Sequence, residues 1–355
     1  KEGKGSAELI RPVTLFSLPK WSFFNEPLQI DANGLKLRDA LRYLKFLDVL
    51  DAELYGKITV KRIKNGFAFV PENNFTVKNL TLEVGENDFQ ILKVDEGQFF
   101  NSEFAVVNKE FQMKADISLL DSKLTATGFA NSKDLFFEVK NAQVNFSDLG
   151  NIAKTELAGQ GKLNLTVKGP TKKTRLDFDG KFSNFSVLGY QLGDADIDIS
   201  IPISQGMVVI NKVEALMGAT PISGSGSISW RNSDIALGID SPLAYHSDVV
   251  KILNPIFSKL SFLPKDLDFK TKIDAYIYGK INLDDLKIKA NLNAHDVMAY
   301  SEFFNEAAIE LEFKKRELSF NKVKFKKDQS YITGNFSYNL MNDYLRLGFL
   351  WDNLL

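Results

Sequence analysis

The sequence predicts a mainly β protein, an antiparallel sheet of tandem meander repeats with short amphipathic helices between the repeats. Two observations predict the sheet: apolar and polar residues alternate with a period of two over most of the chain, and turn residues recur about every 8 to 14 positions. Strands with one apolar and one polar face are typical of antiparallel sheets, because parallel sheets are usually buried on both faces. A third observation, helical spacing in two segments, places the helices.

The segment 161–169 shows the strand pattern most clearly. Leu163, Leu165 and Val167 fall on one face, and polar residues such as Asn164 occupy the positions between them. Such a strand buries one face and leaves the other in water. The same period recurs further along the chain at Leu176, Phe178 and Phe182, at Ile197 and Ile199, at Ile273 and Ile277, at Ile288 and Leu292, at Leu311 and Phe313, and at Phe320.

Two segments have the spacing of an amphipathic helix instead. Residues 35–50 carry apolar side chains at i, i+3, i+4, i+7 and i+10 counted from Leu37, which predicts a helix there. A second helix is expected to begin near Ser247, a suitable N-cap residue, and Pro255 is expected to kink or divide it. A shorter helix of a few turns is expected within 147–154.

The expected helices divide the chain into repeats, because each one precedes a strand of similar type. The last two repeats align at an offset of about 110 residues, so that Leu176 matches Leu286 and Gly226–Trp230 matches Gly334–Tyr338. Repeats of this kind stack, and neighbouring units continue one sheet and one core. We therefore expect an N-terminal extension with the first strands at 1–34. A first repeat (helix plus β-meander) follows at 35–145, a second repeat at 146–240 and a third repeat (helix plus β-meander) at 241–355.

The composition argues against several classes of function. The 44 Lys and Arg residues balance 45 Asp and Glu residues, so the net charge of −1 gives no electrostatic reason to expect nucleic-acid binding. The absence of Cys and the presence of two His exclude thiol catalysis, disulfides and nearly all zinc sites. We expect no enzyme activity, no cofactor and no metal. Residues 1–6 are polar and lack a starting Met, so we expect a piece of a longer protein.

Residues that could carry chemistry have simpler explanations. His246 and His295 lie about fifty residues apart without a serine elbow, and we interpret them as loop or surface residues. Gly224-Ser225-Gly226 leads into a strand, so we interpret it as a bend or bulge rather than a phosphate loop. The acidic run Asp194, Asp196 and Asp198 is expected on a solvated strand face, and a carboxylate pair or a calcium site is the alternative. The basic run is also expected on a solvated face, and a site for anionic headgroups is the alternative; it comprises Lys322, Lys324, Lys326 and Lys327.

The apolar face of such a sheet can be arranged in two ways. It closes onto a second sheet as a sandwich core, or the sheet only curls and the face lines an open trough. Large exposed apolar surfaces are rare in soluble proteins unless a partner covers them. The partner suited to a long trough is an acyl chain, because each buried methylene contributes about 0.8 kcal/mol.

Three segments of the chain resemble the repeats of a known protein family. The strand Gly161–Gly169, the segment Gly224–Trp230 and the strand Asp234–Ile239 resemble the repeats of the AsmA-like family, whose TamB- and YhdP-type members are repeating-β-groove, bridge-like lipid-transfer proteins. The resemblance covers roughly residues 35–355. It implies an elongated, curled β-sheet with a hydrophobic groove and no catalytic residues. It also implies a periplasmic protein of the Gram-negative envelope, anchored in the inner membrane through a segment absent from this chain.

We therefore expect a non-enzymatic lipid-binding protein whose groove carries phospholipid acyl chains between the inner and outer membranes. One alternative is an assembly factor that pairs its sheet edge with strands of β-barrel proteins. Others are a closed β-sandwich structural protein and a carbohydrate-active β enzyme. The expected groove residues are Leu163, Leu165, Val167, Leu176, Phe178, Phe182, Ile197, Ile199, Ile273, Ile277, Ile288, Leu292, Leu311, Phe313 and Phe320.

Overall fold

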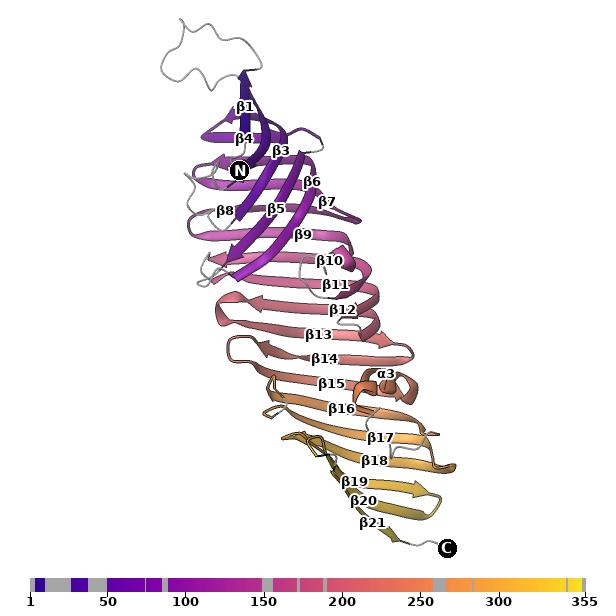
Figure 1. Cartoon of the computed structure of the whole chain (residues 1–355). Helices are drawn as coiled ribbons and strands as arrows, with labels where there is room; N and C mark the ends of the chain where they lie inside the picture. Colours follow the sequence, from indigo (N-terminus) through magenta and orange to yellow (C-terminus); the bar gives the residue numbers. More distant parts are fainter. Residues whose placement is uncertain are drawn as a thin grey trace, which may run out of the picture. The chain divides into compact units, whose positions relative to one another are not determined.

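The described chain is mainly β and antiparallel, as the sequence predicts (Figure 1). It divides into two compact units. Unit 1 comprises Lys1–Gly189 and Ile201–Gln205, and unit 2 comprises Tyr190–Ser200 and Gly206–Leu355. The computed structural model describes residues 4–9, 27–37, 50–73, 75–84, 89–148, 156–170, 173–187, 190–257, 266–282, 284–342 and 344–352.

Unit 1 is an antiparallel meander in which strands adjacent in the chain pair with each other in the sheet. A short 3₁₀ helix, η5 (Ile203–Gln205), also belongs to this unit. The strands are β1 (Lys4–Leu9), β2 (Leu28–Lys36), β3 (Leu50–Ile63), β4 (Gly66–Pro71), β5 (Phe75–Val84), β6 (Phe89–Val107), β7 (Glu110–Leu119), β8 (Ser122–Ala130), β9 (Asp134–Asn145), β10 (Leu157–Pro170) and β11 (Arg175–Val187).

The strands β4 and β5 lie end to end and together occupy one strand position between β3 and β6. The first half of β3 pairs with β5 and its second half pairs with β4. Both short strands pair with the long strand β6 on their other side. They therefore act as a single strand that is interrupted between Pro71 and Phe75, where the Glu72 amide still donates to the Lys57 carbonyl.

Unit 2 is also an antiparallel meander, in which each strand pairs with the next one along the chain. Its strands are β12 (Tyr190–Pro202, whose last two residues belong to unit 1), β13 (Met207–Met217), β14 (Thr220–Ser229), β15 (Asp234–Tyr245), β16 (Asp268–Lys280), β17 (Lys287–Ala299), β18 (Glu302–Lys314), β19 (Glu317–Lys327), β20 (Ser330–Asn339) and β21 (Tyr344–Asp352). The helix α3 (His246–Phe257) follows β15 and contacts β15 and β16 (Figure 1).

The helix expected near Ser247 is thus confirmed, and it begins one residue earlier, at His246. Pro255 does not divide it, since α3 runs without a break to Phe257. Residues 146–148 are helical, in agreement with the start of the shorter expected helix. The helix expected over 35–50 is wrong at its ends, because Leu35 and Lys36 belong to β2 and Leu50 begins β3. Its residues 38–49, and residues 149–154 of the shorter helix, lie outside the described residues. The repeat boundaries stay a prediction.

Asparagine bulges keep the apolar residues on one face of the sheet. Asn101, Asn141 and Asn184 have positive φ angles and lie where the strand register shifts. Asn tolerates this left-handed conformation better than most residues. The extra residue at Asn141 and Asn184 brings Ala142 and Phe185 back to the apolar face, which a strict period of two would not do.

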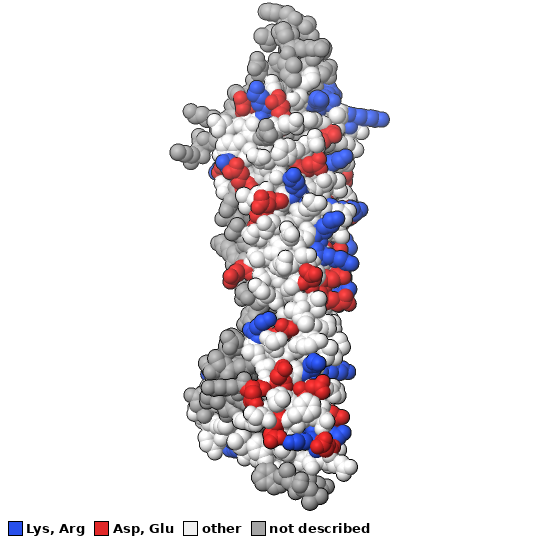
Figure 2. Space-filling view, turned by 90° about the vertical axis from the view of Figure 1, so that its right-hand side faces the viewer, with Lys and Arg blue, Asp and Glu red and all other residues white. Residues whose placement is uncertain are grey.

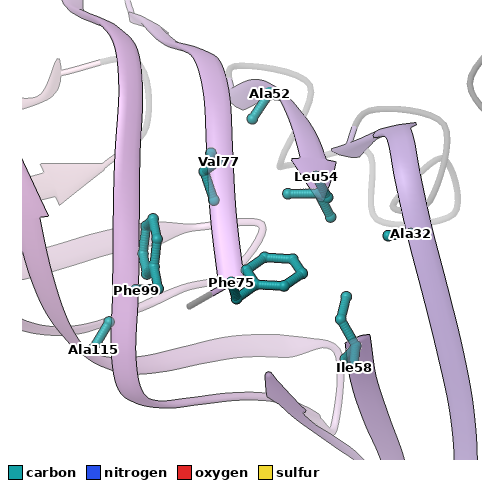
Figure 3. Packing of buried hydrophobic residues seen from close by; sticks show 8 residues of the cluster. All are labelled: Ala32, Ala52, Leu54, Ile58, Phe75, Val77, Phe99 and Ala115. Atoms are coloured by element: carbon teal, nitrogen blue, oxygen red, sulfur yellow. The ribbon is translucent and has the colours of Figure 1, made fainter. Parts of the chain in front are cut away.

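The apolar face of unit 1 forms a packed core near β2–β7. The core cluster joins buried residues of β2, β3, β5, β6 and β7, and its side chains point toward one another (Figure 3). Small and large residues are mixed in it, so that the large side chains fill the space beside the small ones. The members are Ala32, Ala52, Leu54, Ile58, Phe75, Val77, Phe99 and Ala115.

Candidate functional site

Strand register gathers the predicted residues of unit 2 onto one face. Ile277 lies opposite Ile288, and Ile288 lies opposite Phe313. Four residues earlier on β16, Ile273 lies opposite Leu292. Because directly opposite residues point to the same side of a sheet, these residues form one apolar face, together with Ile197 and Ile199 on β12.

The middle of this face is half-buried, and it contains only aliphatic residues and glycine. On the apolar side of β14–β18, the middle positions hold Ile, Leu, Ala and Gly, without an aromatic ring. We call the following thirteen half-buried residues the aliphatic patch: Ile222, Ile228, Ile235, Leu237, Ile239, Ile273, Ala275, Ile277, Ile288, Ala290, Leu292, Ile309 and Leu311. A facing sheet would bury such residues more fully, as happens in sandwich cores.

The last strands of unit 2 differ from the aliphatic patch because they carry aromatic rings on the apolar face. The Phe320 and Phe336 rings stack with their centroids 3.9 Å apart. Phe313, Phe320 and Tyr338 are buried. The predicted groove residues Phe313 and Phe320 therefore pack against protein neighbours rather than lining an open surface, and the predicted residue Ile197 on β12 is buried as well.

The predicted residues of unit 1 also share one face. Leu165 lies opposite Phe178, and Val167 lies opposite Leu176. Leu163, Val167 and Phe182 are buried, whereas Leu165, Leu176 and Phe178 are half-buried. Val167 packs in a cluster with Phe111, Ala130 and Leu135, which β10 shares with β7, β8 and β9. This part of the face is a packed core with a half-buried margin.

The opposite face is polar, and several of its charged residues pair with each other. Lys212 bonds to Glu214 at 2.9 Å and to Asp196 at 3.2 Å, and these hydrogen bonds raise the pKa of Lys212. Asp198 accepts a hydrogen bond from Asn211. Figure 2 shows both signs of charge interspersed on the face that it displays. Among the described residues, no group of three or more His, Asp or Glu is placed to hold a metal ion.

The basic run on β19 is neutralised by glutamates of the neighbouring strand β18. Lys322 bonds to Glu310 at 2.8 Å, Lys326 bonds to Glu306 at 3.5 Å, and Lys327 pairs with Glu302. Lys324 lies 4.1 Å above the ring of Tyr331. The solvated-face interpretation of this run agrees with these contacts.

The two histidines lie in different surroundings. His246 begins α3, and its ring lies 4.9 Å from the Phe269 ring. Burial lowers the pKa of His246, while the carboxylate of Asp268 acts in the opposite direction. His295 is exposed on the polar face and lies opposite Lys270 and Glu306.

The aliphatic patch includes strands that the sequence analysis did not select. Ile222, Leu237 and Ile239 belong to β14 and β15, where Gly224 and Gly226 occupy apolar positions. These glycines hide the alternation in the sequence. At Gly226, with φ of 150°, an added Cβ would collide with the Ala236 carbonyl oxygen, so the glycine is required by the close approach of β15.

No helix among the described residues is long and apolar enough to cross a membrane. Comparisons of the chain with family models, with curated proteins and with solved structures found no match.

Proposed function

We propose that this chain is a non-enzymatic lipid-binding protein and that its apolar face holds the acyl chains of phospholipids. The observation that carries the proposal is the aliphatic patch, a half-buried surface of thirteen residues on five neighbouring strands. Half-buried aliphatic residues retain contact with solvent, and each methylene that a ligand removes from water contributes about 0.8 kcal/mol.

The size of the patch suits one acyl chain. Five strands at a spacing of about 4.8 Å extend about 19 Å across the sheet. One leaflet of a bilayer core is about 15 Å thick, so an extended acyl chain crosses a similar distance. Ile, Leu, Ala and Gly offer no hydrogen bonds and no charge, so the patch would accept acyl chains without selecting among headgroups.

The resemblance of the repeats to the AsmA-like family supports the same assignment and adds a location. In this proposal the chain lies in the periplasm of a Gram-negative cell and belongs to a longer protein anchored in the inner membrane. Phospholipid then moves along the apolar face between the inner and outer membranes. The partners are the lipid and the two membranes.

The test is mass spectrometry of organic extracts from the purified protein. Leu237→Asp combined with Ile288→Asp places two carboxylates in the aliphatic patch, and the matched control Ala236→Asp with Lys289→Asp places them one residue away on the polar face. We expect phospholipid with the wild type and the control, and several-fold less with the patch variant at an unchanged far-ultraviolet circular dichroism spectrum. Equal phospholipid in both variants would refute the proposal.

A second candidate function is strand addition to a β-rich client, and the strand β21 favours it. Among the described strands, β21 pairs only with β20. It exposes Leu347 by 55%, Phe349 by 48% and Leu350 by 77%. Exposed, apolar edge strands pair readily with other chains. Gly348→Pro removes a backbone donor from β21, so loss of client-peptide capture with retained phospholipid would favour this second function.

A further inference from the structure

Two helix starts, one in each unit, are held by the same hydrogen-bond arrangement. In unit 2 the Asp248 carboxylate accepts from the Ala219 amide and from the Thr220 hydroxyl, both at 3.0 Å. The Thr220 hydroxyl oxygen in turn accepts from the Tyr245 amide at 3.0 Å. The first turn of α3 is thereby tied to the hairpin between β13 and β14. We call this arrangement the Asp248 latch.

Unit 1 contains the same arrangement at the end of β9. The Asp148 carboxylate accepts from the Asp121 amide at 3.2 Å and from the Ser122 hydroxyl at 2.7 Å. The Ser122 hydroxyl oxygen accepts from the Asn145 amide at 3.0 Å. Here the hairpin is the one between β7 and β8. We call it the Asp148 latch.

The two latches share a sequence spacing as well as a geometry. In both, the Asp follows the last strand residue by three positions and follows a Ser, as Phe146-Ser147-Asp148 and His246-Ser247-Asp248 show. In both, a hydroxyl residue begins the strand after the hairpin. The recurrence in two separate units indicates one device used twice rather than a chance contact.

Burial makes the latches energetically significant. Ser122 and Thr220 are 0% and 1% exposed, and both aspartates are buried. Burial by itself raises the pKa of Asp248, but the hydrogen bonds from Ala219 and Thr220 and the Lys251 ammonium outweigh it and lower the pKa overall. A buried carboxylate without these donors would be strongly unfavourable, so the hairpin dictates where the helix begins.

Gly218 in the β13–β14 hairpin fits this close approach. Its φ is 62°, and an added Cβ would collide with the Asp248 carboxylate. Only glycine lets the helix start come so near to this hairpin.

Each latch lies beside the apolar face. The Phe146 ring packs edge-on against Phe182 at 4.6 Å and against Phe185 at 5.1 Å. The corresponding His246 ring lies against Phe269. The chain therefore leaves the sheet, turns over its apolar side and begins a helix there, and α3 lies against one end of β15 and β16 (Figure 1).

We propose that Asp148 and Asp248 are positioning residues that hold the helical residues 146–148 and the helix α3, respectively, beside the margin of the apolar face, and that α3 thereby slows the entry of acyl chains into the aliphatic patch. The entry part of this inference rests on the proposed function. The positioning part depends only on the hydrogen bonds and burial described above.

Hydrogen exchange tests the positioning part without any lipid. Asp248→Ala and the milder Thr220→Val each remove partners of the Asp248 latch. We expect exchange of the amides of Tyr245 and of residues 246–257 to accelerate about tenfold or more, with Thr220→Ser restoring the protection. Lys251→Ala removes one partner of the buried Asp248 carboxylate, at 3.3 Å, but leaves the hairpin donors in place, so it should accelerate exchange less than Asp248→Ala. Unchanged exchange in both latch variants would overturn the positioning role.

Stopped-flow binding of a hexadecanoic acid that carries a terminal pyrene tests the entry part on the same variants. We expect several-fold faster association for Thr220→Val and less than about a threefold change in equilibrium affinity. Faster exchange with unchanged association would overturn the entry role of α3 and leave the latch intact. If the wild type binds no probe, both the proposed function and the entry role fail, whereas the exchange result still decides the positioning role.

Discussion

The apolar face of β2–β7 in unit 1 and the aliphatic patch of unit 2 have the same alternating pattern but different fates. The first combines Phe75 and Phe99 with three alanines and is buried. The second is built of Ile, Leu and two alanines, without an aromatic ring, and stays half-buried. Aromatic rings bury a large apolar area and fill the space beside small residues, whereas the aliphatic side chains of the patch leave their face partly open. Alternation thus defines which face is apolar, and the aromatic rings distinguish the closed region from the half-buried one.

The largest effect is expected from a truncation in the closed core. Phe75 is 3% exposed, so Phe75→Ala leaves a cavity and should reduce the free energy of unfolding by about 3–5 kcal/mol. Ile277→Ala in the half-buried patch should reduce it by only about 1–2 kcal/mol. Urea unfolding, with hydrogen exchange to separate the two units, measures both. Equal losses would mean that the patch is as closed as the core of unit 1.

The next effect comes from filling the patch. Ala275 and Ala290 lie opposite each other on the apolar face, and replacing both with Phe imitates the composition of unit 1. We expect bound phospholipid to fall several-fold, because the rings occupy the surface proposed for the acyl chain. Lys289→Phe on the polar face is the matched control. Undiminished phospholipid in the double variant would separate lipid binding from this surface.

A pH effect should distinguish the two helix starts. The lowered pKa of His246 means that the folded state favours the neutral ring. The unfolded state binds the proton more readily, so this contribution to stability is complete above the ordinary pKa of about 6.5 and is lost as the pH falls through the lowered value. The protection of the α3 amides, measured relative to their intrinsic exchange rates, should therefore decrease as the pH falls below about 6.5.

Phe146 occupies the equivalent position in unit 1 and does not titrate, so exchange at residues 146–148 should lack this dependence. His246→Phe should remove it from α3. A persistent loss of protection at low pH in that variant would assign the effect to another group.

The smallest effect is expected from the paired lysines of β19. Lys322 pairs with Glu310 on an exposed surface, and such pairs contribute about 0–1 kcal/mol. Lys322→Ala should change the free energy of unfolding by less than about 0.5 kcal/mol and should not change the amount of phospholipid bound. A clear loss of anionic phospholipid in the extracts would instead indicate headgroup binding at this strand.

The strands were predictable from sequence because their alternation is local. Leu163, Leu165 and Val167 point to one face as their spacing predicts, and the helix at α3 follows from its caps and apolar spacing. The degree of burial was not predictable, since Phe313 and Ile288 have the same phase but only Phe313 is buried. Packing across strands decides that difference.

The hydrogen-bond partners of Asp248 could not be predicted from the sequence pattern either. Local spacing suggested that it lies beside a helix N-cap, but its partners Ala219 and Thr220 lie about thirty residues earlier. Such pairings depend on strand register, which bulges shift by one residue at a time.

The asparagine bulges have a consequence for how this chain tolerates insertions and deletions. Asn141→Gly or Asn141→Asp keeps the residue count and the left-handed backbone, so either change should be mild. Deleting Asn141 would instead shift the side-chain alternation of β9 by one residue on one side of the deletion. Either Val144 or Phe137 would then point to the polar face, and its charged neighbours would point to the apolar face. Related chains should therefore gain or lose residues at the hairpin turns and vary in identity, not in length, at these bulges.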